Sequence, residues 1–316
     1  MRFDKFVSNA KPTSFAISEG SMYERLRRHP SIEFDPYIYH ASLIYSDTAI
    51  QTLEGIHREY IDVAQKYRLP IFTLTDTWRA SEERINLSNF KDNRVNQDNA
   101  HFLRGLCNSY GETAQPIFLG GQIGPRGDAY KPEEALSKVD AESFHANQLL
   151  ALAEAGVDFL YAATLPALSE AQGIAAAMSQ FGLPYMLSFV IRPDGTLLDG
   201  TPLGEAMDRI DNSVTTPPTG YAVNCVHPQI FTSGMSALEG QNKTYSRRIL
   251  SFQANTANLR PEELEGSVEL ISEEPNVLAE LMVDSQRSFH TLFMGGCCGT
   301  DTRHIEQLAQ KYTTMS

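Results

Sequence analysis

The sequence predicts an α/β protein folded as one (β/α)8 barrel, the TIM-barrel architecture, and three observations lead to this class. Short runs of β-branched and aromatic residues alternate with longer amphipathic segments, which is typical of βα units that feed a parallel sheet. Eight alternations fit within 316 residues, which favours a closed barrel over an open sheet. No linker-like stretch marks a boundary, so we expect residues 1–316 to form a single domain.

The eight expected strands are short runs bounded by turn-forming residues. They cover residues 14–20, 71–77, 116–124, 158–164, 184–190, 221–226, 247–255 and 291–297. Helices are expected between them at residues 46–67, 96–113, 133–155, 168–181, 275–287 and 301–311, with shorter segments after the fifth and sixth strands. In the first helix, Ile50, Leu53, Ile61 and Ala64 recur at helical spacing.

Two polar segments, residues 87–98 and 195–219, are expected to be long loops. The second contains Gly200, Gly204 and Pro217, which favour turns over regular structure. In a barrel, long loops beyond the carboxyl ends of the strands build or cover the active site. We therefore expect these two segments to border the functional site.

The overall charge excludes several classes of partner. Lys and Arg total 26 against 39 Asp and Glu, a formal net charge of −13, so no global basic field attracts nucleic acid or an anionic membrane. The amino-terminal residues lack the continuous apolar core of a signal peptide, and no run reaches transmembrane length. Four cysteines do not suggest a secreted disulfide scaffold. We expect a cytoplasmic protein that acts on small molecules, and a homo-oligomer stays possible.

Three of the four cysteines lie where two apolar runs end. Cys225 ends the sixth expected strand, and Cys297 and Cys298 end the eighth. In a barrel these three residues would meet at the same carboxyl-terminal mouth, one strand apart. Adjacent residues of a regular strand face opposite sides, but the neighbouring glycines 295, 296 and 299 would let the backbone turn so that both sulfurs face one ion.

Three thiolates with one open position are a typical protein contribution to a catalytic zinc site. A substrate thiol that binds as the fourth ligand would lose its proton and could attack an activated alkyl carbon. Other readings stay open: the paired cysteines could simply pack a tight turn, form a redox pair, or belong to a closed structural zinc site with His227 as fourth ligand.

The remaining candidates have less specific roles. Cys107 lies among leucines in an expected helix and is predicted to be a core residue. His227 is expected on a loop, where it would orient substrate or remain solvated. His304 lies inside the last expected helix and is predicted to be a surface residue.

At this point the sequence resembles the zinc-dependent homocysteine S-methyltransferases, which are TIM barrels. The resemblance extends from about residue 17 to residue 305 and rests on five ordered motifs. They are Glu19-Gly20-Ser21-Met22, Thr75-Asp76-Thr77-Trp78-Arg79-Ala80-Ser81, Gly121-Gln122-Ile123-Gly124-Pro125, Val223-Asn224-Cys225, and Gly295-Gly296-Cys297-Cys298-Gly299-Thr300 followed by His304-Ile305. The paired cysteines with an upstream Asn-Cys are the specific element.

The resemblance implies a zinc ion held by Cys225, Cys297 and Cys298. It also implies that homocysteine binds through its sulfur and takes a methyl group from a sulfonium or quaternary-ammonium donor, giving methionine. The chain has no room for the extra domains that serve folate and cobalamin donors in this family. A small donor such as S-methylmethionine, S-adenosylmethionine or a betaine-like compound is therefore expected.

The departures from the family pattern concern the acceptor. Glu19-Gly20 stands where the family has Asp-Gly, and Ala163 aligns with a glutamate that helps to hold the amino group of homocysteine. An ammonium in a closed pocket needs an acceptor. Asp76, where the family commonly has Asn, is a candidate replacement, and we expect Glu19, Gly20, Asp76 and Asn224 to bind substrate. A thiol without an ammonium group, or a non-catalytic zinc-binding paralogue, stays an alternative.

Overall fold

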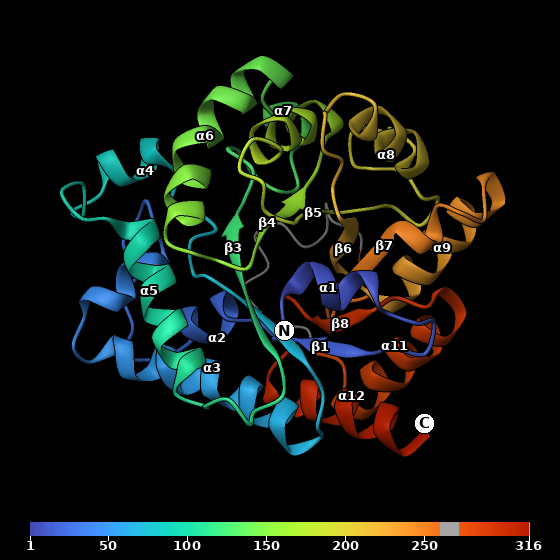
Figure 1. Ribbon diagram of the computed structural model, residues 1–316, viewed down its shortest axis with the longest axis horizontal. Coiled ribbons are helices and arrows are strands. Elements are labelled where there is room, and N and C mark those ends of the chain that lie inside the picture. Colours follow the sequence, from blue (N-terminus) through green and yellow to red (C-terminus); the bar gives the residue numbers. More distant parts are fainter. Residues whose placement is uncertain (260–271, 316) are drawn as a thin grey trace.

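The chain forms a closed barrel of eight parallel strands, which confirms the predicted fold class (Figure 1). The computed structural model describes residues 1–259 and 272–315. Each strand pairs with the next along the chain, and the last pairs with the first. The strands are β1 (Ala16–Ser18), β2 (Ile71–Leu74), β3 (Ile117–Ile123), β4 (Phe159–Leu165), β5 (Tyr185–Phe189), β6 (Gly220–Val226), β7 (Ile249–Ala254) and β8 (Phe293–Gly296).

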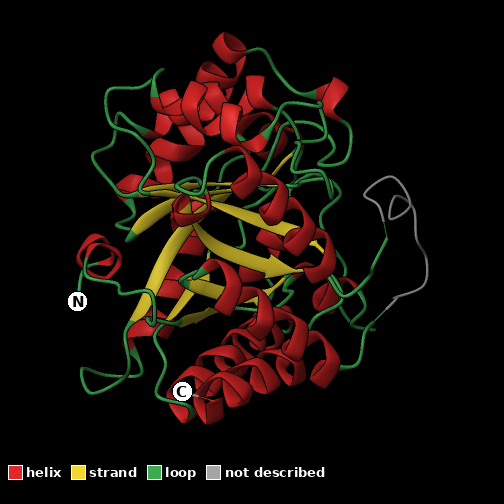
Figure 2. Ribbon diagram, turned by 90° about the vertical axis from the view of Figure 1, so that its right-hand side faces the viewer, coloured by secondary structure: helices red, strands yellow, loops and turns green. Residues whose placement is uncertain are grey.

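Helices surround the barrel, as the ring of ribbons in Figure 1 and the side view in Figure 2 show. One main helix connects each strand to the next, and a last helix follows β8. In chain order they are α3 (Ala49–Lys66), α5 (Val95–Asn108), α6 (Lys138–Glu154), α7 (Leu168–Met178), α8 (Leu203–Asp211), α9 (Pro228–Gln241), α11 (Pro275–Phe289) and α12 (Thr302–Met315). Shorter elements are α1 (Phe3–Ser8), α2 (Tyr23–Arg27), η1 (His40–Tyr45), α4 (Glu82–Leu87), η2 (Pro132–Glu134) and η3 (Ser246–Arg248).

The expected long loops are partly wrong, because both segments contain helix. Helix α8 occupies the middle of residues 195–219, with Leu203, Ala206, Met207 and Ile210 buried on one face. The space beside Gly204 in this helix requires glycine, because a Cβ there would lie 2.7 Å from the Tyr245 ring. Within residues 87–98, α5 already begins at Val95.

A short helix that the sequence did not predict closes the amino-terminal end of the barrel. Phe3 in α1 is 2% exposed and stacks on Phe159 with a centroid distance of 4.1 Å. Its ring also contacts Phe118 at 5.4 Å and Phe293 at 5.7 Å. Aromatic contacts of this kind add to the free energy gained by burying apolar area.

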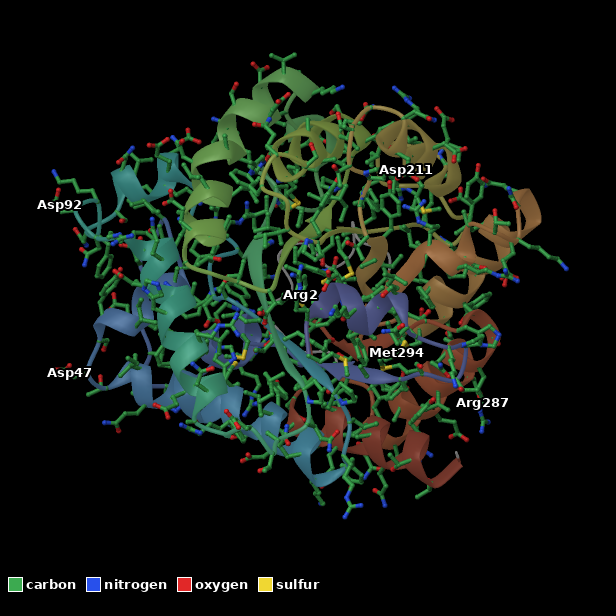
Figure 3. All side chains as sticks on the ribbon, in the orientation of Figure 1. Arg2, Asp47, Asp92, Asp211, Arg287 and Met294 are labelled. Atoms are coloured by element: carbon green, nitrogen blue, oxygen red, sulfur yellow. The ribbon has the colours of Figure 1, made fainter. Side chains whose placement is uncertain are left out.

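The side chains divide clearly between barrel and surface (Figure 3). Met294 of β8 is fully buried, whereas Asp47, Asp92 and Arg287 lie exposed at the rim of the view. Among the helices in the described ranges, none has both the length and the apolar character needed to cross a membrane.

Candidate active site

A cavity of about 450 Å³ opens at the carboxyl-terminal end of the barrel. Its walls come from residues that end or follow the strands, including Glu19 after β1, Trp78 after β2, Ala163 in β4 and Asn224 in β6. This volume lies in the range of sites for small organic ligands. The cavity therefore lies where active sites of this fold are built.

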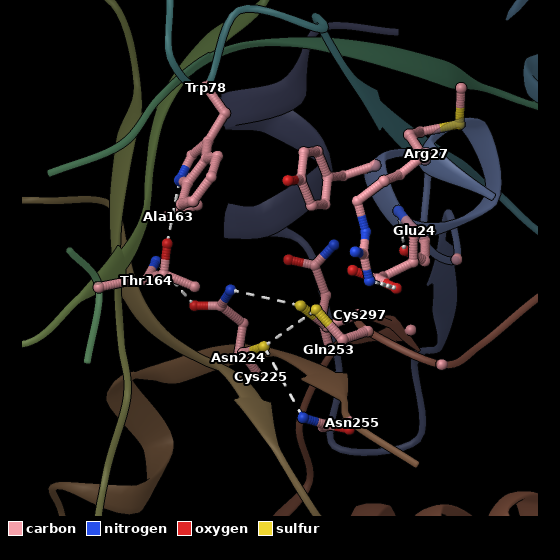
Figure 4. A pocket seen from close by; sticks show the side chains of 18 of the residues that line it. Glu24, Arg27, Trp78, Ala163, Thr164, Asn224, Cys225, Gln253, Asn255 and Cys297 are labelled. Carbon is pink, nitrogen blue, oxygen red and sulfur yellow. Dashed lines mark hydrogen bonds and ion pairs between the residues drawn. The ribbon is translucent and has the colours of Figure 1, made fainter. Parts of the chain in front are cut away.

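The three candidate sulfurs meet on the wall of this cavity (Figure 4). The Sγ atoms of Cys225, Cys297 and Cys298 all lie within 4.8 Å of one another, and Cys225 Sγ is 3.5 Å from Cys298 Sγ. All four cysteines, Cys107 included, are free thiols, and Cys107 is buried in α5 as predicted. Four tetrahedral ligands at a Zn–S distance of about 2.3 Å have sulfurs about 3.8 Å apart. The donor set and its spacing thus fit a zinc ion with one open position.

Local backbone irregularities turn these residues inward. Cys225 has φ +60°, and the pairing of β6 with β7 shifts register between Asn224 and Val226. Because of this bulge, the adjacent residues Asn224 and Cys225 both line the cavity. Thr164 in β4 repeats the arrangement with φ +58° and a register shift after Ala162.

The two bulges are joined by a hydrogen bond. The Thr164 backbone N–H donates to Asn224 Oδ1 at 2.9 Å, and the Ser188 hydroxyl donates to the same oxygen at 2.7 Å. A left-handed backbone at a non-glycine residue costs of order 1–3 kcal/mol and is concentrated at functional sites. Of the five such residues in the described part of the chain, Tyr39, Thr164 and Cys225 line the cavity.

The turn that carries Cys297 and Cys298 depends on its glycines, as predicted. Gly299 has φ +84°, and a Cβ there would lie 1.9 Å from Thr256 Oγ1. Gly295 is needed for close approach, since a Cβ would lie 2.0 Å from Ser18 Oγ. The two cysteines therefore follow β8 in a tight turn, and the Thr300 N–H closes it on the Cys297 carbonyl.

The hydrogen bonds among the three thiols shift their pKa values in opposite directions. Hydrogen bonds from Cys297 and Cys298 hold the pKa of Cys225 well below its usual range. The same hydrogen bonds with the Cys225 thiolate raise the pKa of Cys297 and of Cys298 well above their usual range. Three thiolates this close together need a cation to be stable, which is what a divalent metal supplies.

A tyrosine from the loop after β3 reaches the sulfur cluster. The Tyr130 hydroxyl lies 3.1 Å from Cys225 Sγ, and burial first, then the Cys225 charge, raises the pKa of this phenol well above its usual range. Two side-chain amides also approach the cluster. Asn255 Nδ2 lies 3.9 Å from Cys225 Sγ, and Asn224 Nδ2 lies 3.9 Å from Cys297 Sγ. Such partners orient metal ligands.

The loop that carries Tyr130 is fixed by two buried charged side chains. Arg79 Nη1 donates to the carbonyls of Pro125 at 2.9 Å and Gly127 at 2.6 Å, while its guanidinium stacks 4.1 Å from the Trp78 ring centroid. Burial lowers the pKa of Arg79 to about 10, so it stays charged near neutral pH.

From the helical layer, Glu170 Oε1 accepts hydrogen bonds from the Arg126 N–H at 2.8 Å and from His145 Nε2 at 2.9 Å. Glu170 is fully buried in α7, and His145 is 1% exposed in α6. The site is therefore held from outside the barrel as well as from the strands.

Arg79→Met is expected to lower the free energy of unfolding by about 1–3 kcal/mol, because the buried carbonyls of Pro125 and Gly127 lose their donor. Faster amide hydrogen exchange in residues 126–130 should accompany this loss. The control is Arg84→Met, whose guanidinium donates to the Tyr37 carbonyl in a contact that is partly exposed to solvent; it should change stability by about 0.5 kcal/mol or less. Equal losses in both variants would contradict the role given to Arg79.

A second cluster of buried ionisable groups lies behind the cavity wall. Glu19 lines the cavity, and its Oε2 accepts hydrogen bonds from the Thr73 hydroxyl at 2.5 Å and the Leu74 N–H at 3.2 Å. His57 Nε2 lies 2.9 Å from Asp76 Oδ2, and His57 Nδ1 lies 3.2 Å from Thr73 Oγ1. A continuous chain of hydrogen bonds thus runs from Glu19 through Thr73 and His57 to Asp76.

The structure separates the candidate substrate residues. Glu19, Gly20 and Asn224 line the cavity, but Asp76 is not part of its lining. Both Asp76 oxygens face histidines, His57 at 2.9 Å and His40 at 3.6 Å. Asp76 therefore lies behind these rings and not in the cavity lining, which differs from the expected direct contact with substrate.

The two candidate histidines are also placed differently from the prediction. His227 is 1% exposed, and its Nδ1 accepts the Gln229 N–H at 3.3 Å to cap α9, while Nε2 bonds Glu273 at 2.9 Å. His304 is 2% exposed, so the predicted surface position is wrong; its Nε2 donates to the Glu273 carbonyl at 3.1 Å. Both rings are fully used, and neither belongs to the sulfur cluster.

Sequence reasoning missed His57, Arg79 and Tyr130. His57 had a usable signal, since it lies four residues after Leu53 and four before Ile61 on the apolar face of α3. A polar residue buried on such a face needs a partner. Tyr130 had none, because its place depends on how the loop is folded.

Comparison with known proteins gives consistent relatives. A sequence profile of the family described as homocysteine S-methyltransferase matches residues 16–312. The homocysteine S-methyltransferase YbgG of Bacillus subtilis (strain 168) is 25% identical over 268 residues, which cover 82% of this chain and 75% of that protein. The homocysteine S-methyltransferase of Escherichia coli (strain K12) is 27% identical over 134 residues, 40% of this chain and 43% of that one.

Among solved structures, the fold is similar to that of the homocysteine methyltransferase MmuM from Escherichia coli. Its oxidized form gives a TM-score of 0.74 at 19% identity and covers 96% of this chain and 97% of that one. Its metallated form gives 0.74 at 18% identity, with 97% and 98% covered.

Proposed function

Because the chain belongs to the homocysteine S-methyltransferase family and is therefore an S-methyltransferase, we propose that it methylates the thiol of homocysteine, giving methionine. We propose that the donor is a small sulfonium or quaternary-ammonium compound, that Cys225, Cys297 and Cys298 hold a zinc ion, and that residues 1–316 act as one catalytic unit. The observation that carries this proposal is the convergence of three sulfurs within 4.8 Å on the wall of a ligand-sized cavity.

When bound, zinc would lower the pKa of a coordinated substrate thiol and keep the thiolate available as a nucleophile. The protein contributes the arrangement around it. Tyr130 and Asn255 flank the Cys225 sulfur, and Asn224 flanks that of Cys297. These contacts fix the cluster at one side of the cavity, so an acceptor sulfur held there faces the open volume where a donor can approach.

Other residues of the cavity lining suit the two cationic groups of the substrates, the ammonium group of homocysteine and the sulfonium or quaternary-ammonium group of the donor. Glu19 offers a carboxylate to the ammonium group of homocysteine. The rings of Tyr23, Tyr39 and Trp78 also line the cavity, and aromatic faces attract sulfonium and quaternary-ammonium cations. In the transfer, the new sulfur–carbon bond forms as the donor's carbon–heteroatom bond breaks, and the donor leaves as a neutral sulfide or tertiary amine.

A second candidate keeps the fold and the metal but changes the acceptor. Ala163 lines the cavity where the family resemblance places a glutamate for the amino group. A pocket with one carboxylate fewer holds an ammonium less well. This observation favours a thiol without an ammonium group as the alternative acceptor.

The test combines metal analysis with a substrate panel. Purified protein should contain about one zinc per chain. It should transfer methyl groups from S-methylmethionine, S-adenosylmethionine or betaine to homocysteine. Comparison with 4-mercaptobutanoate, which is homocysteine without its amino group, decides between the two acceptors. Failure of all donor and acceptor pairs with zinc-loaded protein would overturn the proposal.

A further inference from the structure

We propose that the Thr73 hydroxyl relays one proton between Glu19 and His57, with Asp76 as the counter-ion of His57, so that Glu19 becomes a carboxylate when an ammonium group enters the cavity. This inference rests on the proposed function, because the ammonium group is that of homocysteine. Glu19 would be the residue that contacts substrate, while Thr73, His57 and Asp76 would act through it as positioning residues.

The directions of the hydrogen bonds lead to this relay. The Thr73 hydroxyl has one hydrogen but two close partners, Glu19 Oε2 at 2.5 Å and His57 Nδ1 at 3.2 Å. His57 Nε2 faces the Asp76 carboxylate at 2.9 Å and therefore donates to it. Only the proton between Glu19 and His57 Nδ1 remains to be placed.

Two arrangements satisfy every group in this chain of contacts. In the first, His57 Nδ1 donates to Thr73 Oγ1 and Thr73 donates to Glu19, so His57 is an imidazolium and Glu19 a carboxylate. In the second, a protonated Glu19 donates to Thr73 and Thr73 donates to His57 Nδ1, so both ends are neutral. Passing from one to the other moves two hydrogens along Thr73 Oγ1, and the total number of protons is unchanged.

Burial shifts the pKa values of both groups between which the proton moves. Glu19 is 5% exposed, Asp76 3% and His57 fully buried. Burial raises the pKa of Glu19 to about 7 even though the charge of His57 opposes this rise. Burial disfavours the imidazolium, but the charge of Asp76, its hydrogen bond to His57 and the charge of Glu19 together outweigh burial and raise the pKa of His57. Both ends of this buried chain of hydrogen bonds can therefore hold the proton.

Within the described residues, several other ionisable groups act on this chain of contacts or on its neighbour Tyr60. His40 of η1, whose pKa is lowered by burial, Tyr60 of α3, Cys107 of α5 and Tyr161 of β4 face its members, while Arg25 of α2 and Asp301 after β8 face Tyr60. The phenols and Cys107 have raised pKa values because of burial and stay neutral near neutral pH. Asp76, 2.9 Å from His57 Nε2, is thus the nearer of the two carboxylates that stabilise the His57 proton, the other being Glu19 at 3.7 Å from Nδ1.

The charge on Glu19 would therefore differ between a cavity without substrate and one that holds an ammonium group. A carboxylate buried beside the cavity without a cation is costly, and the neutral arrangement avoids that cost. When an ammonium group approaches the Glu19 oxygen that has no hydrogen bond within the described residues, the proton moves to His57 and the full negative charge appears at the wall. Asp76, which cannot reach the cavity, would compensate for Ala163 in this way.

The experiment compares Asp76→Asn with the wild type on two acceptors, homocysteine and 4-mercaptobutanoate, with zinc-loaded protein. Without the Asp76 charge, more of Glu19 stays protonated, so KM for homocysteine should rise about tenfold near neutral pH. In the wild type KM should fall as pH rises through about 7, the pKa of Glu19, and in the variant this midpoint should move to higher pH. KM for 4-mercaptobutanoate and kcat for both acceptors should change little, and Asp76→Glu should restore the wild-type profile.

A spectroscopic readout separates the relay from a structural role. In protein labelled with ¹⁵N-histidine, the His57 signal, assigned by its loss in His57→Gln, should shift toward the imidazolium form when homocysteine binds, and should not do so in Asp76→Asn. The control is Asp98→Asn, which removes a carboxylate that accepts a hydrogen bond from the Tyr45 hydroxyl at 2.7 Å. Asp98 is not part of the cavity lining. It should leave both KM values and the His57 signal unchanged.

The outcomes are distinct. If the wild type methylates homocysteine but Asp76→Asn raises KM equally for both acceptors, or leaves the pH midpoint unmoved, the relay is wrong and the proposed function stands. A His57 signal that stays neutral with homocysteine bound also overturns the relay. If the wild type methylates only 4-mercaptobutanoate, the proposed acceptor is wrong, and the relay is overturned with it.

Discussion

Cys225→Ser is expected to remove most of the bound zinc and to lower kcat/KM for methyl transfer by more than about a hundredfold. Loss of partners outside the ligand set already costs about 10–100-fold in metal affinity or activity, and Cys225 is a ligand itself in the proposed site. Its sulfur lies 3.5 Å from Cys298 Sγ and 3.1 Å from the Tyr130 hydroxyl, and the remaining cysteine, Cys107, is not part of the sulfur cluster. Zinc content after dialysis against a weak chelator and initial rates measure the effect.

Cys107→Ser is the matched control, because it changes a buried cysteine in α5 that is not part of the sulfur cluster. It should keep about one zinc per chain and near wild-type rates. A Cys225→Ser protein that retained both zinc and activity would show that the sulfur cluster is not the metal site.

Phe3→Ala should lower the free energy of unfolding by about 3–5 kcal/mol, since it leaves a cavity among Phe118, Phe159 and Phe293. Helix α1 closes the end of the barrel opposite the cavity, so kcat/KM should stay close to wild type under conditions where the variant is folded. Urea denaturation followed by circular dichroism measures the loss.

Phe102→Ala serves as the comparison for Phe3→Ala. Phe102 is half-buried on α5 and packs only against the edge of the core, so its loss of stability should be smaller. If the two variants lost equal free energy, the amino-terminal helix would have no special part in closing the barrel.

The barrel could be predicted because its pattern is local. Each strand is a short apolar run beside a turn signal, and each outer helix shows one apolar face, so both can be recognised without knowing their neighbours. The order of eight such pairs then constrains the topology. The meeting of Cys225 with Cys297 and Cys298 followed from that topology together with the glycines beside the cysteine pair.

The parts that could not be predicted depend on tertiary contacts. The close approach of Tyr245 to Gly204 in α8 depends on a residue 41 positions away in the sequence, and α1 is anchored by contacts of Phe3 with three rings from other elements. His304 seemed exposed by helical position but is buried against the Glu273 carbonyl. Propensity is a weak guide wherever such contacts decide the outcome.

The candidate site shows the same division. Strand ends identified Glu19 and Asn224 as cavity residues, since position along a strand fixes them. Asp76 also follows a strand, but sequence could not show that two histidines from α3 and η1 would stand on either side of its carboxylate. The contacts of a carboxylate are set by packing between elements far apart in the chain.

The paired bulges at Thr164 and Cys225 have a consequence for how this protein can evolve or be engineered. Glycine at position 164 would relieve the strain of the left-handed backbone there, because glycine adopts φ +58° at little cost. It would also delete the hydroxyl that accepts a hydrogen bond from Trp78 Nε1 at 3.0 Å and so loosen the aromatic wall. Position 225 offers no such exchange, because its side chain is the sulfur. Relief of backbone strain and retention of the site contacts therefore conflict at these two residues.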